Sequence, residues 1–315
     1  MLSAAQHEAV TSEAAWPLQI LAGPGSGKTR VLTSRVAHLV RDSAAPIAPE
    51  RCVVVTFTNR AANEMRARLE TMIGADRTRR LVLGTFHAVC VRFLRRWGTR
   101  LGLDPRFTIA DTDDARRLLR DVDRAAPVEA TLAAISRAKA HGWTPDELRA
   151  SAQHAPGSPA HTEHLALCRT YAAYQQQLRT SHALDFDDLL LLGVRLFREH
   201  PELTTHIDHV LVDEFQDTNA VQYELLRRLS RHVSVVGDPD QSIYSWRHAD
   251  VRHIERMHLD FPGLHRVLLE ENYRSTPQIL EAALRVMQQD PHRIPKGLYT
   301  ALASGPPVGV VACHD

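Results

Sequence analysis

One stretch, residues 22–29 with the sequence AGPGSGKT, follows the phosphate-loop pattern GxxxxGK[ST] with alanine in place of the first glycine, and it constrains the fold more than any other part of the chain. It lies between an apolar run at residues 18–21 and apolar residues at helical spacing over 31–40. In such a strand, loop and helix, backbone N–H groups face phosphates, Lys28 reaches the terminal phosphates, and Thr29 offers a hydroxyl to Mg²⁺. We therefore predict a nucleotide triphosphate site at Gly23, Gly25, Ser26, Gly27, Lys28 and Thr29.

The composition is that of an ordinary globular chain, with 315 residues of which 44% are apolar. No apolar run approaches the roughly 18 residues that a membrane span needs. Residues 1–10 are polar, unlike a signal sequence, so we expect a cytoplasmic protein with no membrane partner. The formal net charge of +1 does not by itself indicate nucleic acid. The cysteines form no CxxC pair, so we expect buried apolar side chains rather than a zinc or disulfide framework at Cys52, Cys90, Cys168 and Cys313.

Two further strands are expected to end in rings near the phosphate loop. The β-branched run at residues 52–57 is typical of a strand buried on both faces of a parallel sheet, and it ends at Phe57. A strand at residues 81–85 is followed by His87. Ligands bind at the carboxyl edge of such sheets, and nucleic-acid bases stack on exposed rings, so a second ligand is suggested. Core packing of each ring is the alternative.

Two adjacent acids follow the next apolar run, at residues 210–212. At the end of a strand, both carboxylates can face the nucleotide. Asp213 would hold Mg²⁺, directly or through water, and Glu214 would polarise the attacking water. This pair predicts nucleotide hydrolysis.

After another buried run at residues 233–236, Gln241 is placed to touch both the γ-phosphate and the segment that follows it. That segment carries two rings and a guanidinium, Tyr244, Trp246 and Arg247, which fit stacking on single-stranded nucleic acid. A core position for Trp246 is the alternative. After the last strand, Arg274 is a candidate arginine finger for the transferring phosphoryl group.

The pattern becomes helical from about residue 91 to residue 208, which indicates a helical domain inserted into the α/β domain. Helices are expected at residues 115–125, 128–140 and 164–178. The stretch LDFDDLL at residues 184–190 has three carboxylates, which suit helix capping better than a metal site. Five arginines could line a phosphate backbone or form a solvated helix face, and both readings stay open: Arg92, Arg95, Arg96, Arg100 and Arg106.

Taken in order, the motifs are AGPGSGKT, TFTNRAANEM, GTFHAVC, LDFDDLL, VLVDEFQDTN, VVGDPDQSIYSWR and LEENYRST. Together they resemble the UvrD/Rep/PcrA family of superfamily 1 DNA helicases, over essentially the whole chain. The resemblance implies an α/β fold, a RecA-like phosphate-loop NTPase with a parallel sheet and an inserted all-helical subdomain. The implied division is residues 1–90 and 208–273 for the first motor domain, 91–207 for the insertion, and 274–315 for the truncated start of a second RecA-like domain.

The resemblance also implies an activity, namely ATP hydrolysis with Mg²⁺ coupled to 3′ to 5′ movement along single-stranded DNA. By motif position, Gln6 would read adenine, and Arg30 and Tyr273 would sandwich it. A glutamine amide, which donates and accepts, suits the adenine edge. The groups implied to serve phosphates, Mg²⁺ and water are Lys28, Thr29, Asp213, Glu214, Gln241 and Arg274. The groups implied to meet DNA are Phe57, Arg60, His87, Tyr244, Trp246 and Arg247.

Two departures from the family pattern affect these expectations. His248 stands where the family usually has a glycine, and no second motor domain with its further arginine is recognisable. A stepping motor needs two lobes, so we expect these 315 residues alone to bind ATP and single-stranded DNA, hydrolyse slowly and not unwind duplex. The missing domains, or a repair or replication protein, would be partners. A non-translocating binding module is the main alternative, and a small phosphate-loop kinase explains the motifs less well.

Overall fold

The computed structural model describes residues 1–152, 157–230, 232–243, 249–290, 293–309 and 311. The chain forms two compact units. The first consists of Met1–Gly84, His206–Thr218 and Ser230–Asp315, and the second of Thr85–Thr205 and Asn219–Leu229.

The first unit is built on a six-stranded sheet with the order β3-β2-β6-β7-β1-β8. The pairings of β1 with β7 and β8, of β2 with β6, and of β6 with β7 are all parallel. Four of the strands, β1, β2, β6 and β7, are buried along their whole length with apolar side chains on both faces. The predicted α/β class with a parallel sheet is confirmed. The strands are β1 (Leu18–Ala22), β2 (Cys52–Thr56), β3 (Val82–Thr85), β6 (His209–Val212), β7 (Val233–Gly237) and β8 (His265–Leu269).

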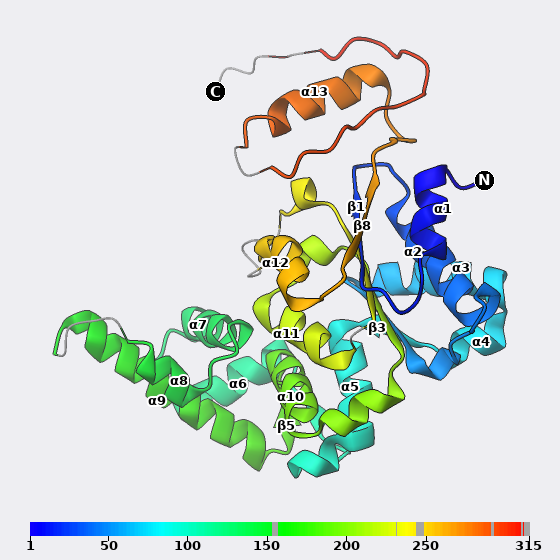
Figure 1. Ribbon diagram of the computed structural model, residues 1–315. Helices are drawn as coiled ribbons and strands as arrows, with labels where there is room; N and C mark the ends of the chain where they lie inside the picture. The colour runs from blue at the N-terminus through cyan, green and yellow to red at the C-terminus, as the bar shows by residue number, and fades with distance from the viewer. Residues whose placement is uncertain (153–156, 231, 244–248, 291–292, 310, 312–315) are drawn as a thin grey trace. The chain divides into compact units, whose positions relative to one another are not determined.

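Helices accompany this sheet, and α1 lies beside α2 and β8 (Figure 1). Ser3 caps the first helix through a reciprocal pair of hydrogen bonds with Gln6, and Thr58 caps α3 by accepting from Ala61 N. The helices are α1 (Ala4–Thr11), α2 (Lys28–Ala37), α3 (Asn59–Ile73), α4 (Ala75–Arg80), α12 (Arg252–Asp260) and α13 (Pro277–Met287). Short 3₁₀ or π turns in this unit cover His38–Asp42, Pro49–Arg51, Phe215–Asp217 and Pro239–Gln241, and the 3₁₀ turn Pro201–His206 reaches it from the second unit.

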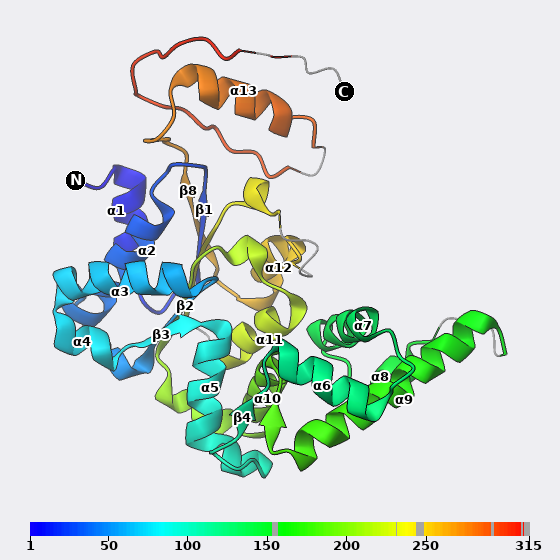
Figure 2. The same cartoon turned by 180° about the vertical axis from the view of Figure 1, so that it is seen from behind.

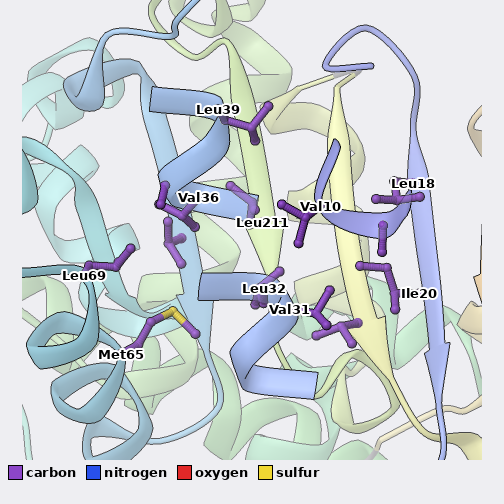
Figure 3. Close-up of a cluster of buried hydrophobic side chains, with 14 of the residues drawn as sticks. Val10, Leu18, Ile20, Val31, Leu32, Val36, Leu39, Met65, Leu69 and Leu211 are labelled. Atoms are coloured by element: carbon purple, nitrogen blue, oxygen red, sulfur yellow. The ribbon is translucent and has the colours of Figure 1, made fainter. Parts of the chain in front are cut away.

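The core of the first unit lies where α2 and α3 meet the sheet (Figure 3). Val31, Leu32 and Val36 from α2 are fully buried among strand residues such as Ile20 and Leu211. The helical spacing of the apolar side chains after the phosphate loop therefore fixes one face of α2 against β1 and β6. This packing holds the loop rigidly between its strand and its helix.

A buried arginine fastens α1 to this core. The Arg35 side chain is fully buried, and burial lowers its pKa to about 10. Its Nε donates to Ser234 Oγ at 2.7 Å, and its Nη1 donates to the backbone oxygens of Ala9, Val10 and Ser12 at 3.2, 3.2 and 2.9 Å. A guanidinium at the carboxyl end of α1 satisfies carbonyls that the helix leaves free. The helix that carries Gln6 is therefore an integral part of the unit.

The second unit is mainly helical, and α6, α7, α8 and α9 pack together (Figure 2). Its helices are α5 (Phe86–Trp97), α6 (Thr112–Val122), α7 (Val128–Ala140), α8 (Pro145–Ala150), α9 (Pro159–Thr180), α10 (Phe186–Glu199) and α11 (Ala220–Leu229), with a 3₁₀ turn at Gly98–Leu101. A two-stranded parallel pair, β4 (Thr108–Ile109) with β5 (Ala183–Leu184), was not predicted. A pattern of two residues is too short to reveal a strand in sequence.

The three carboxylates of LDFDDLL start α10. Asp185 is the N-cap and accepts from Asp188 N at 2.9 Å, so the predicted capping role is confirmed. In addition, the fully buried Lys139 ammonium lies 2.6 Å from Asp185 Oδ2 and 2.8 Å from Asp188 Oδ1. In the part of the chain that the structure describes, no cluster of three or more His, Cys, Asp or Glu side chains is arranged to hold a metal ion. The stretch is a buried ion-pair centre of the helical unit.

Two simpler expectations concern membranes and cysteines. Within the described ranges, no helix is both long and apolar enough to cross a bilayer. Cys52, Cys90 and Cys168 are free and buried, as expected, and Cys313 lies outside the described residues.

Candidate functional site

The phosphate loop joins β1 to α2 through two glycines in the left-handed region. Gly25 has φ 66° and Gly27 has φ 86°, conformations that side chains other than glycine adopt at a cost. The Ser26 hydroxyl donates to Gly23 O at 2.7 Å and closes the turn. The loop therefore presents backbone N–H groups at the amino end of α2, the geometry that binds phosphate.

The Lys28 side chain contacts residues that follow two other strands of the sheet. Its Nζ donates to Gln241 Oε1 at 3.0 Å and lies 3.7 Å from Glu214 Oε2, and the side chain is 11% exposed. Lys28 follows β1, Glu214 follows β6, and Gln241 follows β7. These three sequence-predicted residues are thus brought together at the carboxyl edge of the sheet. The carboxylate of Glu214 is partly exposed, so the Lys28 ammonium can exchange it for phosphate oxygens.

The two acids after β6 occupy different environments. Asp213 is 4% exposed and accepts from Glu214 N at 3.1 Å. Burial, and then the charge of Glu214, raise the pKa of Asp213 to about 7. Glu214 has φ 49°, so its backbone is in the left-handed region, which is uncommon for a residue with a side chain and is typical of functional turns.

The oxygen groups near the loop fit a magnesium ion. Asp213 supplies a buried carboxylate, and Thr29, at the first turn of α2, supplies a hydroxyl. The buried Oδ1 of Asp217 accepts no hydrogen bond from the described residues, and burial followed by the charge of Glu214 raises the pKa of Asp217 to about 6. Hard oxygen ligands suit Mg²⁺, which usually takes only one or two of them from protein and the rest from phosphate and water.

Gln216 is a site residue that the sequence analysis missed. It is buried, its Nε2 donates to Glu214 Oε2 at 2.9 Å, and its Oε1 accepts from Asp238 N at 3.0 Å. A Cβ at Gly237 would lie 2.7 Å from this Oε1, so the glycine permits the approach. The amide ties the ends of β6 and β7 together. Its place in the motif at residues 213–217 was visible in the sequence, but its partner Asp238, directly after β7, was not.

The three residues expected at the adenine base already make hydrogen bonds within the chain. Gln6 is 3% exposed, its Nε2 donates to Ser26 O at 2.9 Å, and its Oε1 accepts from Ser3 N at 3.1 Å. Reading adenine would require this amide to exchange those partners. Arg30 donates to Met1 O at 3.0 Å, and Tyr273 donates to Glu271 Oε2 at 2.5 Å, both from exposed positions.

Asn272 is a second missed residue, and it docks the segment after β8 on the phosphate loop. Its Nδ2 donates to Pro24 O at 2.6 Å, while its Oδ1 accepts from Arg274 N at 2.8 Å and from Ser275 N at 2.7 Å. Tyr273 N donates to Gly25 O at 3.0 Å. The backbone of Arg274 is thereby held against the loop, with its side chain exposed.

The residues expected to contact DNA fall in several places. Phe57 is half-buried after β2, and Arg60 is exposed and paired with Glu64 at 3.1 Å. Tyr244, Trp246, Arg247 and the unusual His248 lie outside the described residues.

His87 belongs to the second unit. Its ring contacts Phe186 edge to face, with 5.9 Å between the centroids, and burial lowers its pKa. Histidine in that state is neutral at pH 7, so it offers a ring rather than a charge. Phe186 is 51% exposed and was missed as a candidate. The signal in the sequence was an aromatic residue between two acids, where a side chain is commonly exposed.

Most of the clustered arginines serve the helical unit itself. Arg95 donates to Pro105 O at 2.5 Å and to Phe107 O at 3.1 Å, and its guanidinium lies 4.6 Å from the Phe107 ring centroid. Arg100 pairs with Glu202, and Arg106 pairs with Asp104 at 3.2 Å. These contacts favour the structural alternative over a phosphate-binding stripe.

Comparison with known proteins gives two kinds of match. The family model described as the UvrD/REP helicase N-terminal domain matches residues 2–262. The chain is similar to ATP-dependent DNA helicases named PcrA: 40% identical over 319 residues in Staphylococcus epidermidis, covering 96% of this chain and 42% of the relative. The identities are 41% over 315 residues in Leuconostoc citreum, covering 95% of this chain and 41% of the relative, and 40% over 315 residues in Staphylococcus aureus, covering 95% and 42%. The chain thus spans less than half the length of these relatives.

Proposed function

The chain belongs to the UvrD/REP helicase family, and on that basis we propose that it binds ATP with Mg²⁺ and single-stranded DNA as the amino-terminal motor part of a 3′ to 5′ DNA helicase. The observation that carries the proposal is the meeting of Lys28, Glu214 and Gln241 above the phosphate loop, at 3.0 and 3.7 Å from the lysine ammonium. A glycine turn with a purely structural role does not require a cation, an acid and an amide from three strand ends to lie together.

In the proposed mechanism, the Lys28 ammonium leaves Glu214 for the terminal phosphates of ATP and keeps its hydrogen bond to the Gln241 amide oxygen. Thr29 and Asp213 would hold Mg²⁺, which supplies positive charge to the phosphate oxygens. An ion there also favours the ionised form of Asp213, whose pKa of about 7 lies near neutrality without it. Glu214, freed from the lysine, orients and deprotonates the attacking water. Arg274 is the candidate arginine finger.

The proposed DNA contacts use rings and guanidinium groups at the strand ends. Phe57 and Arg60 follow β2, and the described residues end at 243 before the segment that carries Tyr244, Trp246 and Arg247. In the second unit, the His87 and Phe186 rings offer a neutral aromatic pair. Stacking of this kind is tolerant of base sequence. Each of these proposed contacts therefore binds single strands without strong sequence preference.

ATP hydrolysis by the purified chain, with and without single-stranded DNA, tests this proposal. We expect hydrolysis to be stimulated by DNA. Lys28→Ala should lose nucleotide binding, whereas Glu214→Gln should keep binding and lose turnover by a factor of about 100 or more, the size of a general-base contribution. Arg285→Met is a matched control, because the pair with Glu281 that it removes is exposed.

The outcomes separate the candidate functions. Binding of ATP and DNA without any stimulated hydrolysis would favour a non-translocating binding module. Hydrolysis unchanged in Glu214→Gln would contradict the proposed base. For the 315 residues alone we expect no strand separation on a 3′-tailed duplex, and ATP-dependent unwinding would refute that expectation.

A further inference from the structure

A buried cluster of four charges lies directly behind Gln241, and the mechanism above does not use it. The Lys296 ammonium donates to Asp238 Oδ1 and lies 3.1 Å from Asp240 Oδ2. Arg293 Nε donates to the same Asp240 oxygen at 3.0 Å. The side chains of Lys296 and Asp238 are both 0% exposed. Four buried charges that balance to zero are costly to assemble, and such a cluster commonly fixes a geometry rather than adding stability.

The cluster determines which way the Gln241 amide points. Gln241 Nε2 donates to Asp238 Oδ2 at 2.6 Å, while its Oε1 accepts from Lys28 Nζ at 3.0 Å. The flipped amide would place its NH₂ group against the Lys28 ammonium and its oxygen against the Asp238 carboxylate. Both contacts would be repulsive. Asp238 therefore orients the amide, and Lys296 in turn holds Asp238.

The segment that carries Lys296 also covers the phosphate loop. Gly297 N donates to Glu270 Oε1 at 2.6 Å, and Tyr299 N donates to Glu270 O at 3.1 Å, so this segment runs beside the end of β8. Between them, the Leu298 side chain lies so close to Gly23 that a Cβ on that glycine would be 2.3 Å from Leu298 Cδ2. The three residues that follow Lys296 thus hold it in place. The chain of contacts from Lys296 through Asp238 and Gln241 to Lys28 is continuous.

We propose that Lys296 is a positioning residue that acts through Asp238 and the Gln241 amide oxygen to hold the Lys28 ammonium where it meets the terminal phosphate, and that it thereby makes the site distinguish ATP from ADP. The inference rests on the proposed nucleotide binding. Gln241 approaches the nucleotide only where Lys28 does, at its terminal phosphates. A disordered Gln241 amide should therefore weaken binding of a triphosphate more than binding of a diphosphate. A merely structural role for Lys296 would weaken both alike.

Calorimetric titration with a non-hydrolysable β,γ-imido analogue of ATP and with ADP, both with Mg²⁺, measures this ratio of affinities. The test variant is the double substitution Lys296→Met with Asp240→Asn, which removes one charge of each sign from the cluster. We expect the preference for the triphosphate to fall about tenfold, the worth of one hydrogen bond to a charged group. The matched control, Arg293→Met with Asp240→Asn, keeps Lys296 on Asp238 and should keep the preference.

A Gln241→Ala background supplies the sharper test. If Lys296 acts through Gln241, the double substitution should change the preference no further in that background. An unchanged preference in the double variant, or an equal fall in both backgrounds, would overturn the inference. If the double variant does not fold, Asp238→Asn replaces it, since an asparagine accepts either orientation of the Gln241 amide and should give the same fall. A wild-type chain that binds neither nucleotide would instead overturn the proposed function, and the inference with it.

Discussion

Replacing Gly25 by alanine tests how tightly the segment after β8 is docked on the phosphate loop. Gly25 has φ 66°, and an added Cβ would lie 2.7 Å from Arg274 Cβ and 3.0 Å from Asn272 Nδ2. The first contact is closer than carbon atoms approach in folded proteins. Asn272 also holds Pro24 O at 2.6 Å, so it has little room to withdraw. The methyl group must push Arg274 and Asn272 off the loop.

The expected loss of stability has two parts. A left-handed backbone costs alanine about 1–2 kcal/mol relative to glycine. Overpacking against a docked segment adds about 1–3 kcal/mol. Gly263 offers a matched control in the same unit, because it has φ 76° but no atom within 4 Å of its added Cβ. Gly263→Ala should therefore show the first cost without the second.

Urea unfolding, followed by fluorescence and far-ultraviolet circular dichroism, gives the free energy of unfolding of both variants. We expect Gly25→Ala to lose about 2–5 kcal/mol in total and Gly263→Ala about 1–2 kcal/mol. Nucleotide affinity should fall in the first variant only. Equal losses in the two variants would refute the idea that the segment after β8 presses on the loop.

Three further outcomes concern the buried charges. Lys139→Met should lower the free energy of unfolding of the helical unit by about 3–5 kcal/mol, because it leaves two carboxylates buried without their cation. Adding Asp188→Asn should recover part of this loss, and urea unfolding measures both variants. Burial, followed by the charge of Asp185, raises the pKa of Asp187 to about 6. The folded state therefore holds the carboxyl proton of Asp187 more tightly than the unfolded state does, and the free energy of unfolding falls as pH rises from about 4 to 6. The stability advantage of Asp187→Asn over the wild type should therefore grow across that window, by about 1–2 kcal/mol for this half-buried group, and a pH-independent difference would contradict the assignment. Arg35→Met should speed amide hydrogen exchange in α1, and unchanged exchange there would show that the arginine does not hold the helix.

The strands and most helices were predictable because their patterns are local. The runs at residues 18–21, 52–57 and 233–236 are apolar on both faces, which only a buried parallel strand explains, and β1, β2 and β7 follow them within a residue or two. The helix predicted at residues 128–140 is found with the same bounds as α7. In contrast, α9 begins at Pro159, five residues before the predicted start, because Ser158 caps it and Pro159 suits the first position of a helix.

The site was predictable in its parts but not in its connections. Motif spacing indicated Lys28, Glu214 and Gln241 separately, and the parallel sheet explains why they meet. The same motifs did not reveal the left-handed backbone of Glu214, because no short pattern specifies that conformation for a glutamate. Nor did they indicate that Lys296 would neutralise Asp238. Contacts between segments far apart in sequence arise from the fold as a whole, and local spacing carries no record of them.

The strand order has a consequence for how the protein is made. β1 is synthesised about 200 residues before its two neighbours in the sheet, β7 and β8, so Leu18 cannot pair until Ser234 and His265 have been made. Until then, an apolar strand has two open edges, a state prone to aggregation. The phosphate loop thus emerges from the ribosome well before the strands that complete its surroundings. Segments of this protein cut before β7 should therefore be poorly soluble, however complete their motifs look.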